Sequence, residues 1–340
     1  MTTLDAQFDR DHEMAHEPGT DETWQESVLM LWYDDARGIG GYHRIGHEVP
    51  RANAATWAGL VAADGSRFRR QCPELPLLAD DRTSNRFGAG EQGLLRREHD
   101  LLWQLDDPDC HLELALEDFY IPRALWEQQG ADVSAATISN HYEASGRAVG
   151  ELRWNGETIA IDALFHRDHS WGPRDWEFVV NHRWFTGTVG PDLSFSIAVM
   201  HGADGRGMAV GGVVRDGVLS VADDIDLVRY EEMDGISHRG GHATITLADG
   251  EVLEITAESL DGILFEHRGF VGISTPCRVT LADGRVGGGV LEASSKLAWT
   301  VPTARRAVVA DGLVPGAGYC AARGAATTST SPVVPSMRTH

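Results

Sequence analysis

Hydrophobic and polar positions along the chain alternate in short runs that are typical of β-strands. The run SVLMLWY at 27–33 is apolar and rich in strand formers, and AATWAGLVA at 54–62 is a second such run. HLELALEDF at 111–119 places Leu112, Leu114 and Leu116 on one face of an extended strand. Helical spacing is rare: residues 122–129, which open with a proline and end before a glycine, predict one short helix.

Turn signals separate these runs. Asp-Gly recurs at 64, 204, 216, 234, 249, 261, 283 and 311, and Asn155-Gly156 adds another. Asp or Asn followed by Gly tolerates the positive φ angles of a tight hairpin turn. We also expect residues 141–154 to form a strand pair around Gly146, followed by a strand over 158–166. So many hairpin signals between short apolar runs predict an antiparallel, all-β protein.

Composition and charge limit the possible partners. The 340 residues are enough for two domains, and 42% of them are hydrophobic, as in an ordinary globular protein. A net charge of -22 argues against binding to nucleic acid or to anionic membranes, and favours a neutral, apolar or cationic ligand. The acidic N-terminal stretch does not resemble a signal peptide, and no apolar run is long enough to span a bilayer. We therefore expect a cytoplasmic protein without stable membrane insertion.

The densest chemistry lies between Ala163 and Trp176, ALFHRDHSWGPRDW. In an extended strand, His166, Asp168 and Ser170 share one face, and Arg167, His169 and Trp171 share the other. The following segment places Trp176, Phe178, Val180, His182 and Trp184 together on one face. An aromatic face with one histidine is suited to an apolar ligand and to proton transfer.

Several other interpretations of these residues stay open. Asp168 and Arg174 could form an ion pair at a domain junction, and His182 could bond only to a backbone carbonyl. His166, His169 and Asp168 could hold a metal ion, although no fourth ligand is evident.

A second motif stands near the N-terminus. His12-Glu13-Met14-Ala15-His16 matches the H-E-x-x-H pattern of zinc proteases. Pro18-Gly19 follows at once and would end any helix there, so a polar N-terminal arm is the favoured interpretation.

Asp168-His169-Ser170-Trp171-Gly172 resembles the D-H-x-W-G motif of the carotenoid hydratase family, whose members consist of two lipocalin-like β-barrels. The hairpin of Leu31–Tyr33 with Gly40–Tyr42 and the segment 141–156 are similar to strands of that family, so that the resemblance covers about residues 25 to 300. Relatives of this fold include terpene-type and Diels–Alder cyclases. The resemblance implies a ligand cavity in or between two barrels, no organic cofactor, and Asp168 as proton donor.

We therefore predict two antiparallel lipocalin-like β-barrels in tandem, over residues 26–170 and 171–305, with a polar arm at 1–25 and a flexible tail at 306–340. The predicted function is a cofactor-independent hydratase, dehydratase or cyclase that protonates an alkene or alcohol of an apolar, isoprenoid- or terpenoid-like substrate. The predicted catalytic residues are Asp168, His169, Asp175 and His182, and the predicted substrate-binding residues are Trp32, Tyr33, His43, Trp171, Arg174, Trp176 and Trp184.

Two other functions stay open. One is a lipocalin-like carrier that binds an apolar ligand without chemistry, and the other is a metal hydrolase that uses the H-E-x-x-H motif. We expect no bound metal and no nucleic-acid partner, and a homodimer is compatible with the sequence.

Overall fold

The computed structural model describes residues 8, 10–124, 140–203, 205, 207–232 and 237–296. Short 3-10 helices lie at η1 (Arg10–Glu13), η2 (Val49–Arg51) and η3 (Ala79–Asp81). The strands are β1 (Trp24–Asp34), β2 (Ile39–Glu48), β3 (Asn53–Ala62), β4 (Arg67–Pro76), β5 (Arg82–Thr83), β6 (Arg86–Ala89), β7 (Gln92–Arg96), β8 (Leu101–Asp107), β9 (Cys110–Asp118), β10 (Asn140–Trp154), β11 (Glu157–Pro173), β12 (Val179–Thr188), β13 (Leu193–Gly202), β14 (Gly207–Arg215), β15 (Val218–Glu231), β16 (His238–Leu247), β17 (Val252–Ser259), β18 (Ile263–His267), β19 (Phe270–Leu281) and β20 (Val286–Lys296). Among the described residues, no helix has the length and apolar character needed to cross a membrane.

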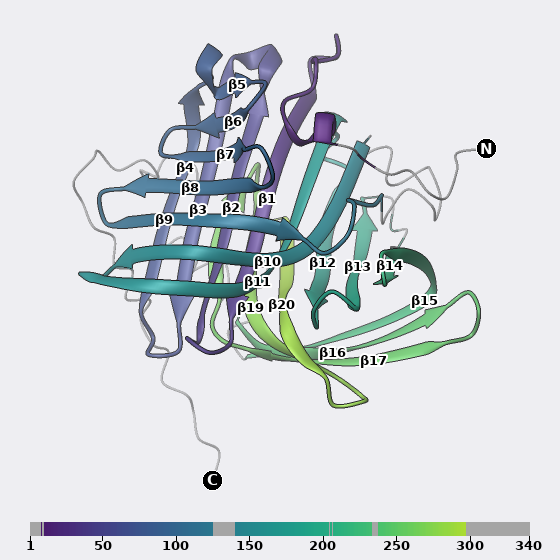
Figure 1. The fold of residues 1–340 in the computed structure, drawn as a ribbon. Coiled ribbons are helices and arrows are strands. Elements are labelled where there is room, and N and C mark those ends of the chain that lie inside the picture. Colours follow the sequence, from purple (N-terminus) through teal and green to yellow (C-terminus); the bar gives the residue numbers. More distant parts are fainter. Residues whose placement is uncertain are drawn as a thin grey trace.

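The first sheet has eleven strands in the order β4-β3-β2-β1-β11-β10-β9-β8-β7-β6-β5. It curls so that β8–β11 run across β1–β4, as Figure 1 shows. Its two edges, β4 and β5, are not joined to each other in the strand order, so it forms an open half-barrel. Strand β1 lies in the middle of the sheet, between β2 and β11, and every neighbouring pair is antiparallel.

The second sheet closes on itself. Its order is β17-β16-β15-β14-β13-β12-β20-β19-β18, and an additional pairing of β17 with β19 completes a barrel of eight strands. Strand β18 lies outside the ring, paired with β19. The predicted all-β fold of two tandem antiparallel barrels is confirmed, with the first barrel open and the second closed.

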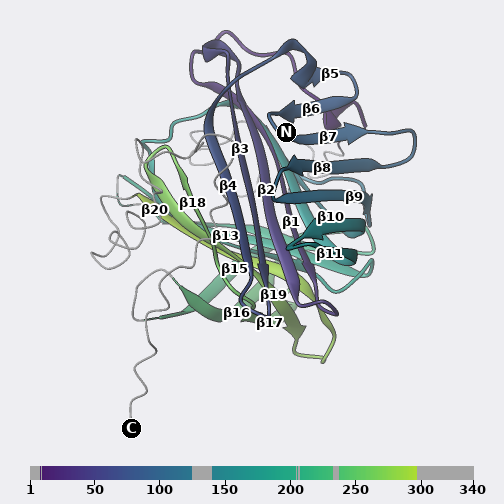
Figure 2. The ribbon, with the colours of Figure 1, turned by 90° about the vertical axis from the view of Figure 1, so that its left-hand side faces the viewer.

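Three hydrophobic cores correspond to this arrangement. One fills the half-barrel, for example Met30, Phe87 and Trp103, and one fills the closed barrel, for example Phe195 and Ile245. The third lies between the sheets. Figure 2 shows β1–β4 between the β5–β11 layer and the second sheet. Because side chains alternate along a strand, β1 contributes to two cores at once.

The outer face of β1–β3 meets the outer face of the second barrel. Tyr42 stacks on Phe265 with ring centroids 5.2 Å apart. The Trp57 indole N–H donates to the Glu266 backbone oxygen over 3.0 Å. Gly59 allows close approach there, because a Cβ on it would lie 2.3 Å from a methyl carbon of Ile263. The two sheets are therefore joined by a packed, hydrogen-bonded interface.

One expected turn is absent. Residues 140–154 form the single long strand β10, and not a strand pair around Gly146. Gly146 is needed for another reason: a Cβ there would lie 2.1 Å from the Glu117 carbonyl oxygen and 2.6 Å from the Phe165 ring. In this strand glycine marks a close approach of backbone and ring.

The Asp-Gly turns are of two kinds. Asn155-Gly156 and Asp216-Gly217 have positive φ at both residues, as in a type I′ turn. At 64, 249 and 283 only the following glycine has positive φ, and the aspartate side chain accepts a hydrogen bond from the N–H two residues later, over 2.8 to 3.0 Å. The hairpin prediction therefore holds, but three of these turns are Asx turns.

The N-terminal arm is polar in composition, yet part of it is buried. Met14 belongs to the half-barrel core, and the Glu13 carboxylate bonds the Arg167 guanidinium over 2.7 Å. The first sheet ends at Pro173 and the second begins at Val179, shortly after the expected boundary at 170/171. The expected helix at 122–129 falls mostly outside the described residues, and the expected tail at 306–340 falls wholly outside them.

Acidification tests the half-barrel core through His43, which is buried between Trp32 and Trp103. Burial lowers the His43 pKa from 6.5 to about 3. Between these values the unfolded chain binds a proton that the folded chain does not, so the free energy of unfolding falls as pH falls. We expect His43→Leu to make this fall shallower by up to about 1.4 kcal/mol per pH unit. Denaturant unfolding between pH 7 and pH 4 measures the slope.

The control is His99→Gln, since the His99 side chain is 87% exposed. This variant should keep the slope of the wild-type protein. Equal slopes for wild-type protein and His43→Leu would contradict the burial of a neutral imidazole in this core.

Candidate active site between the two sheets

A cavity of about 170 Å³ lies at the interface of the two sheets. Strands β1, β2, β3, β10 and β11 contribute one wall, and β12, β13, β18, β19 and β20 contribute the other. Its exposed surface is mainly apolar and aromatic, with Leu29, Trp57, Trp176, Trp184 and Phe265, although about half of its lining residues are polar or charged. These polar side chains can orient a small molecule and take part in chemistry.

Strand β11 places Asp168 on this cavity. His166, Asp168 and Ser170 face the second barrel, whereas Arg167 and His169 face the interior of the half-barrel, as strand alternation predicted. The register aligns Arg44, Leu29, Asp168 and Glu143 in a row across β2, β1, β11 and β10. A charged row thus crosses the centre of the first wall.

Glu292 on β20 supplies the carboxyl group of the opposite wall. Burial, and then the charge of Asp168, raise the Glu292 pKa to about 8. Burial also raises the Asp168 pKa, and the adjacent Glu143 carboxylate adds to the effect. At least one carboxyl group of this pair therefore retains its proton at neutral pH.

Glu143 behaves in the opposite way. His141 Nε2 lies 2.9 Å from one of its carboxylate oxygens, and His166 Nε2 lies 3.3 Å from the other. These two histidines lower the Glu143 pKa to about 2, against the effect of burial. The ionised Glu143 carboxylate thus lies beside Asp168 and Glu292, whose pKa values are raised. The three acids therefore differ in protonation state because their environments differ.

His182 lies on the second wall, next to Glu292. Its Nδ1 is 3.7 Å from a Glu292 carboxylate oxygen, and burial lowers its pKa to about 4. The imidazole is neutral at pH 7 and can accept a proton. Trp184 pairs directly with Glu292 across β12 and β20, so the acid, the imidazole and an indole occupy neighbouring positions.

Arg174 does not pair with Asp168. Its guanidinium donates instead to the Ser27 hydroxyl over 3.3 Å and to the Ser170 hydroxyl and carbonyl. Asp168 feels the charge of Arg174, but no ion pair joins the two groups. The hypothesis of a simple salt bridge at the domain junction is therefore not supported.

The cavity brings together six of the predicted site residues: Asp168, Arg174, Asp175, Trp176, His182 and Trp184. Asp175 is exposed at the rim.

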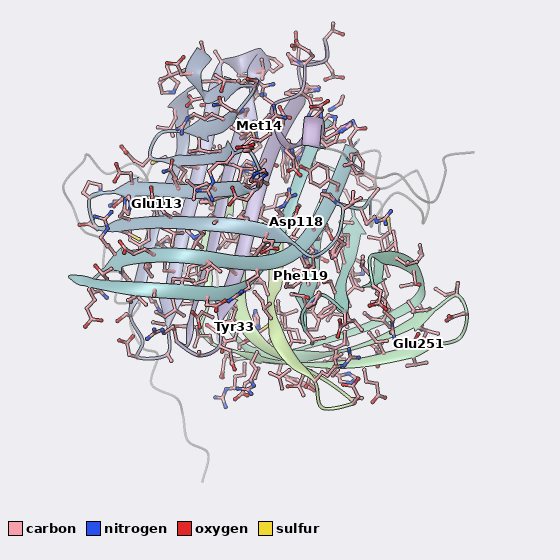
Figure 3. All side chains as sticks on the ribbon, in the orientation of Figure 1. Met14, Tyr33, Glu113, Asp118, Phe119 and Glu251 are labelled. Carbon is pink, nitrogen blue, oxygen red and sulfur yellow. The ribbon has the colours of Figure 1, made fainter. Side chains whose placement is uncertain are left out.

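The other predicted residues do not line this cavity. Trp32 and His43 point into the half-barrel, because they lie on the opposite strand faces from Leu31 and Tyr42. Tyr33 lies near the end of β1, remote from Met14 (Figure 3), where its hydroxyl donates to Asp35 over 3.1 Å. Within the D-H-x-W-G motif, His169 and Trp171 likewise point into the half-barrel, because they alternate along β11 with Asp168 and Ser170.

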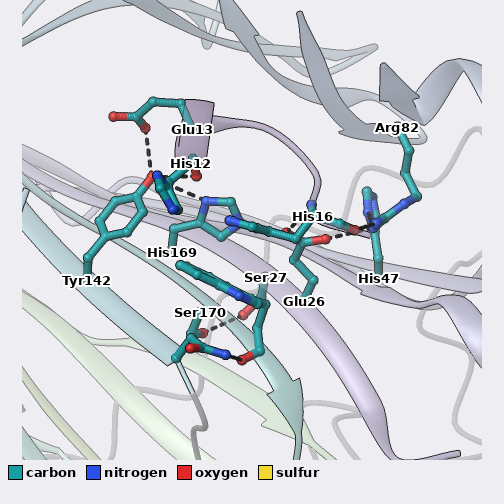
Figure 4. Close-up of polar contacts among 12 residues, drawn as sticks. His12, Glu13, His16, Glu26, Ser27, His47, Arg82, Tyr142, His169 and Ser170 are labelled. Carbon is teal, nitrogen blue, oxygen red and sulfur yellow. Dashed lines mark hydrogen bonds and ion pairs between the residues drawn. The ribbon is translucent and has the colours of Figure 1, made fainter. Parts of the chain in front are cut away.

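His169 and Trp171, the remaining two, belong to a network inside the half-barrel (Figure 4). Glu26 lies 3.0 Å from His169 Nε2 and 2.7 Å from His16 Nδ1, and Arg82 bonds its other oxygen over 2.8 Å. The His16 ring stacks on Trp171 with centroids 3.7 Å apart. His169 and Asp168 thus serve different faces of one strand.

His16, Glu26 and His169 offer ligand atoms that lie within 4.8 Å of one another, close enough to hold a metal ion. In this structure these atoms bond one another, and Arg82 balances the charge of Glu26. The H-E-x-x-H motif itself does not form a helical zinc site. Helix η1 ends at Glu13, before His16, and Glu13 is bound by Arg167 and Tyr142.

Several residues of the cavity wall were not among the predicted site residues, including Arg44 and Trp57. Glu292 was expected on a strand, facing either this cavity or solvent, and the structure places it on the cavity. Arg44 and Trp57 are paired residues on the neighbouring strands β2 and β3, both of which were predicted. Because side chains alternate along a strand, the sequence could have placed Arg44 on the same face of β2 as Tyr42. No pattern in the sequence could have paired Glu292 with Asp168, because they come from different sheets.

The electrostatic interaction between Asp168 and Glu292 can be tested without a substrate. We expect Asp168→Asn to lower the pKa of Glu292 from about 8, since the substitution removes a negative charge that opposes ionisation. Carbon-13 NMR of labelled glutamate carboxyl groups measures this pKa. An unchanged titration of Glu292 in Asp168→Asn would show that the two groups do not interact.

Comparison with solved structures places the fold among known two-barrel proteins. A protein described as AttH from Nitrosomonas europaea matches with a TM-score of 0.65 at 14% identity, over 87% of this chain and 98% of that one. CghA, which has also been crystallised with Sch210972, matches with a TM-score of 0.57 at 12% identity, over 81% of this chain and 88% of that one. Kievitone hydratase from Nectria haematococca matches with a TM-score of 0.53 at 10% identity, over 80% and 88%.

These likenesses confirm, at the level of the fold, the resemblance predicted from the D-H-x-W-G motif. No curated protein has a sequence that matches this chain significantly. A family model described as "Domain of unknown function (DUF7064)" matches residues 9–296, and the chain therefore belongs to that family.

Proposed function

We propose that the protein is a cofactor-independent lyase or isomerase of the hydratase, dehydratase or cyclase type, acting on an isoprenoid- or terpenoid-like substrate in the cavity between the sheets. The observation that carries the proposal is the pair of carboxyl groups with raised pKa values, the half-buried Asp168 and the buried Glu292, on opposite walls of an aromatic cavity. Groups with such raised pKa values are suited to donate a proton at neutral pH.

The chemistry needs one proton and no cofactor. The carboxyl O–H of the Asp168–Glu292 pair breaks, and the alkene π electrons form a new C–H bond, leaving a carbocation on the neighbouring carbon. Trp176 and Trp184 lie on the cavity wall, and an indole face stabilises a desolvated cation by about 2 kcal/mol.

Capture of the cation completes the reaction. In hydration, a water molecule forms a C–O bond and gives a proton to the carboxylate left by the donor, either directly or through His182. In dehydration the same steps run in reverse. In cyclisation, a second alkene of the substrate forms a C–C bond, and loss of a proton to the carboxylate restores the acid. Each route regenerates the pair.

The comparisons support this choice of reaction class. One structural neighbour is by name a hydratase, so the fold accommodates water addition or removal in that protein. The same cavity without its acids would suit a carrier. The raised pKa of Glu292 beside a neutral His182 favours an enzyme, since storage of a ligand needs neither group.

The test uses the small molecule that native mass spectrometry detects on protein purified from its own cells, together with terpenoid alcohols such as geraniol. Each is incubated in deuterated water, and mass spectrometry detects water addition, water loss or new C–D bonds. We expect Asp168→Asn and Glu292→Gln each to slow turnover at least about 100-fold, because each removes a proton donor while keeping its shape.

Binding should survive these substitutions, and quenching of tryptophan fluorescence measures it. Glu254→Gln, at an exposed position of the closed barrel, is the matched control and should keep full turnover. Ligand binding without turnover in the wild-type protein would favour the carrier function, and full turnover by both acid variants would contradict the proposed mechanism.

A further inference from the structure

Two arginines line the first wall of the cavity, and the charge of Asp168 acts on both of them. Arg44 on β2 and Arg174, directly after β11, both line the cavity. Among the described residues, neither forms an ion pair within 4.0 Å. Most other arginines of the described chain do form one, for example Arg70 and Arg167.

Arg44 is held in place without polar contacts. Its guanidinium carbon lies 4.7 Å from the Trp57 ring centroid, which is a cation–π contact. Gly46, two residues later on the same strand face, leaves space for it: a Cβ at Gly46 would lie 2.9 Å from a terminal guanidinium nitrogen. Both terminal nitrogens therefore keep their hydrogen-bonding capacity toward the cavity.

Arg174 is only 8% exposed, and its guanidinium also retains capacity. Its Nε is buried and has no hydrogen-bond partner among the described residues, while one terminal nitrogen holds Ser27 and Ser170. A second indole supports it, since its guanidinium carbon lies 5.7 Å from the Trp176 ring centroid. The other terminal nitrogen makes no hydrogen bond with the described residues, and it can donate to a ligand acceptor in the cavity.

The two positive charges also repel each other. Burial first, and then the charge of Arg44, lower the Arg174 pKa to about 9. Asp168 is the cavity acid that acts on both arginines, and Glu292 is protonated at neutral pH. One carboxyl group therefore serves two guanidinium groups, and part of the positive charge of this wall is left uncompensated by protein groups.

We propose that this arginine pair is an anion subsite, and that the ligand of the cavity is an amphipathic molecule with an apolar isoprenoid-like body and a carboxylate or similar planar oxyanion at one end. The inference rests on the proposed function in so far as both place the ligand in this cavity. The anion subsite adds to that function an anionic head group on the ligand and an orientation of the ligand in the cavity. The anionic end lies between Arg44 and Arg174, and the apolar body extends along the aromatic wall.

Planar oxyanions suit guanidinium groups because two N–H donors can bond two oxygens at once. The serine hydroxyls beside Arg174 offer a further donor to the same anion. A neutral alcohol of equal shape would gain the apolar contacts, but not the charge-assisted hydrogen bonds. The subsite therefore discriminates by charge rather than by size.

The experiment compares geranic acid with geraniol, which share a carbon skeleton and differ in the head group. Isothermal titration calorimetry at pH 7.5 measures both dissociation constants. We expect wild-type protein to bind geranic acid at least about tenfold more tightly, as charge-assisted bonds in a desolvated site predict. Arg44→Gln should abolish the preference, because it removes one of the two guanidinium groups, so that affinity for geranic acid falls at least about tenfold relative to affinity for geraniol.

Arg174→Gln should have the same effect, and Arg174→Lys should restore part of the preference. Arg147→Gln removes an exposed arginine that pairs with Asp162, and as the matched control it should keep the preference for the acid. Equal affinities of wild-type protein for acid and alcohol would overturn the anion subsite alone. Failure to bind either probe would overturn the subsite together with the proposed cavity function.

Discussion

The two-residue alternation of side chains along β1, β2 and β11 is the constraint on which the rest of the structure depends. Each of these strands lies between two cores, so consecutive residues serve different environments. Asp168 faces a cavity shared with the second barrel, whereas His169 belongs to the network around Glu26 inside the half-barrel. A one-residue shift of register would exchange these roles, and would place Glu26 and Arg167 at the interface.

The same constraint explains how much could be predicted. Period-two patterning and Asp-Gly turns are local signals, and they sufficed for the all-β class, the hairpins and the two faces of β11. The D-H-x-W-G motif added the two-barrel fold. The motif is contiguous in sequence but divided in space, so treating His169 and Trp171 as partners of Asp168 in one pocket conflicted with the alternation that the sequence itself implied.

His182 and Trp184 of the second wall were predicted from their aromatic strand, but the approach of Glu292 to Asp168 could not be derived in this way. Glu292 meets Asp168 only because two sheets pack face to face, and nothing near Glu292 in the sequence indicates that contact. The turn predicted at Gly146 is absent for a related reason. The position needs a glycine because the Phe165 ring and the Glu117 carbonyl oxygen approach it closely.

The charge of the cavity also differs from the charge of the whole chain. The chain is strongly acidic, yet the cavity contains two arginines and at least one protonated acid. Net charge describes long-range attraction, whereas a buried site is governed by its nearest groups.

The central claim is that the ligand site lies between the two sheets and not inside either barrel. A crystal structure of the protein with geraniol tests this claim directly, because an uncharged probe depends on the apolar cavity alone. We predict electron density along Trp176 and Trp184, with the hydroxyl group beside Asp168 or Glu292. Density within the closed barrel or the half-barrel core, with the interface cavity empty, would contradict the account.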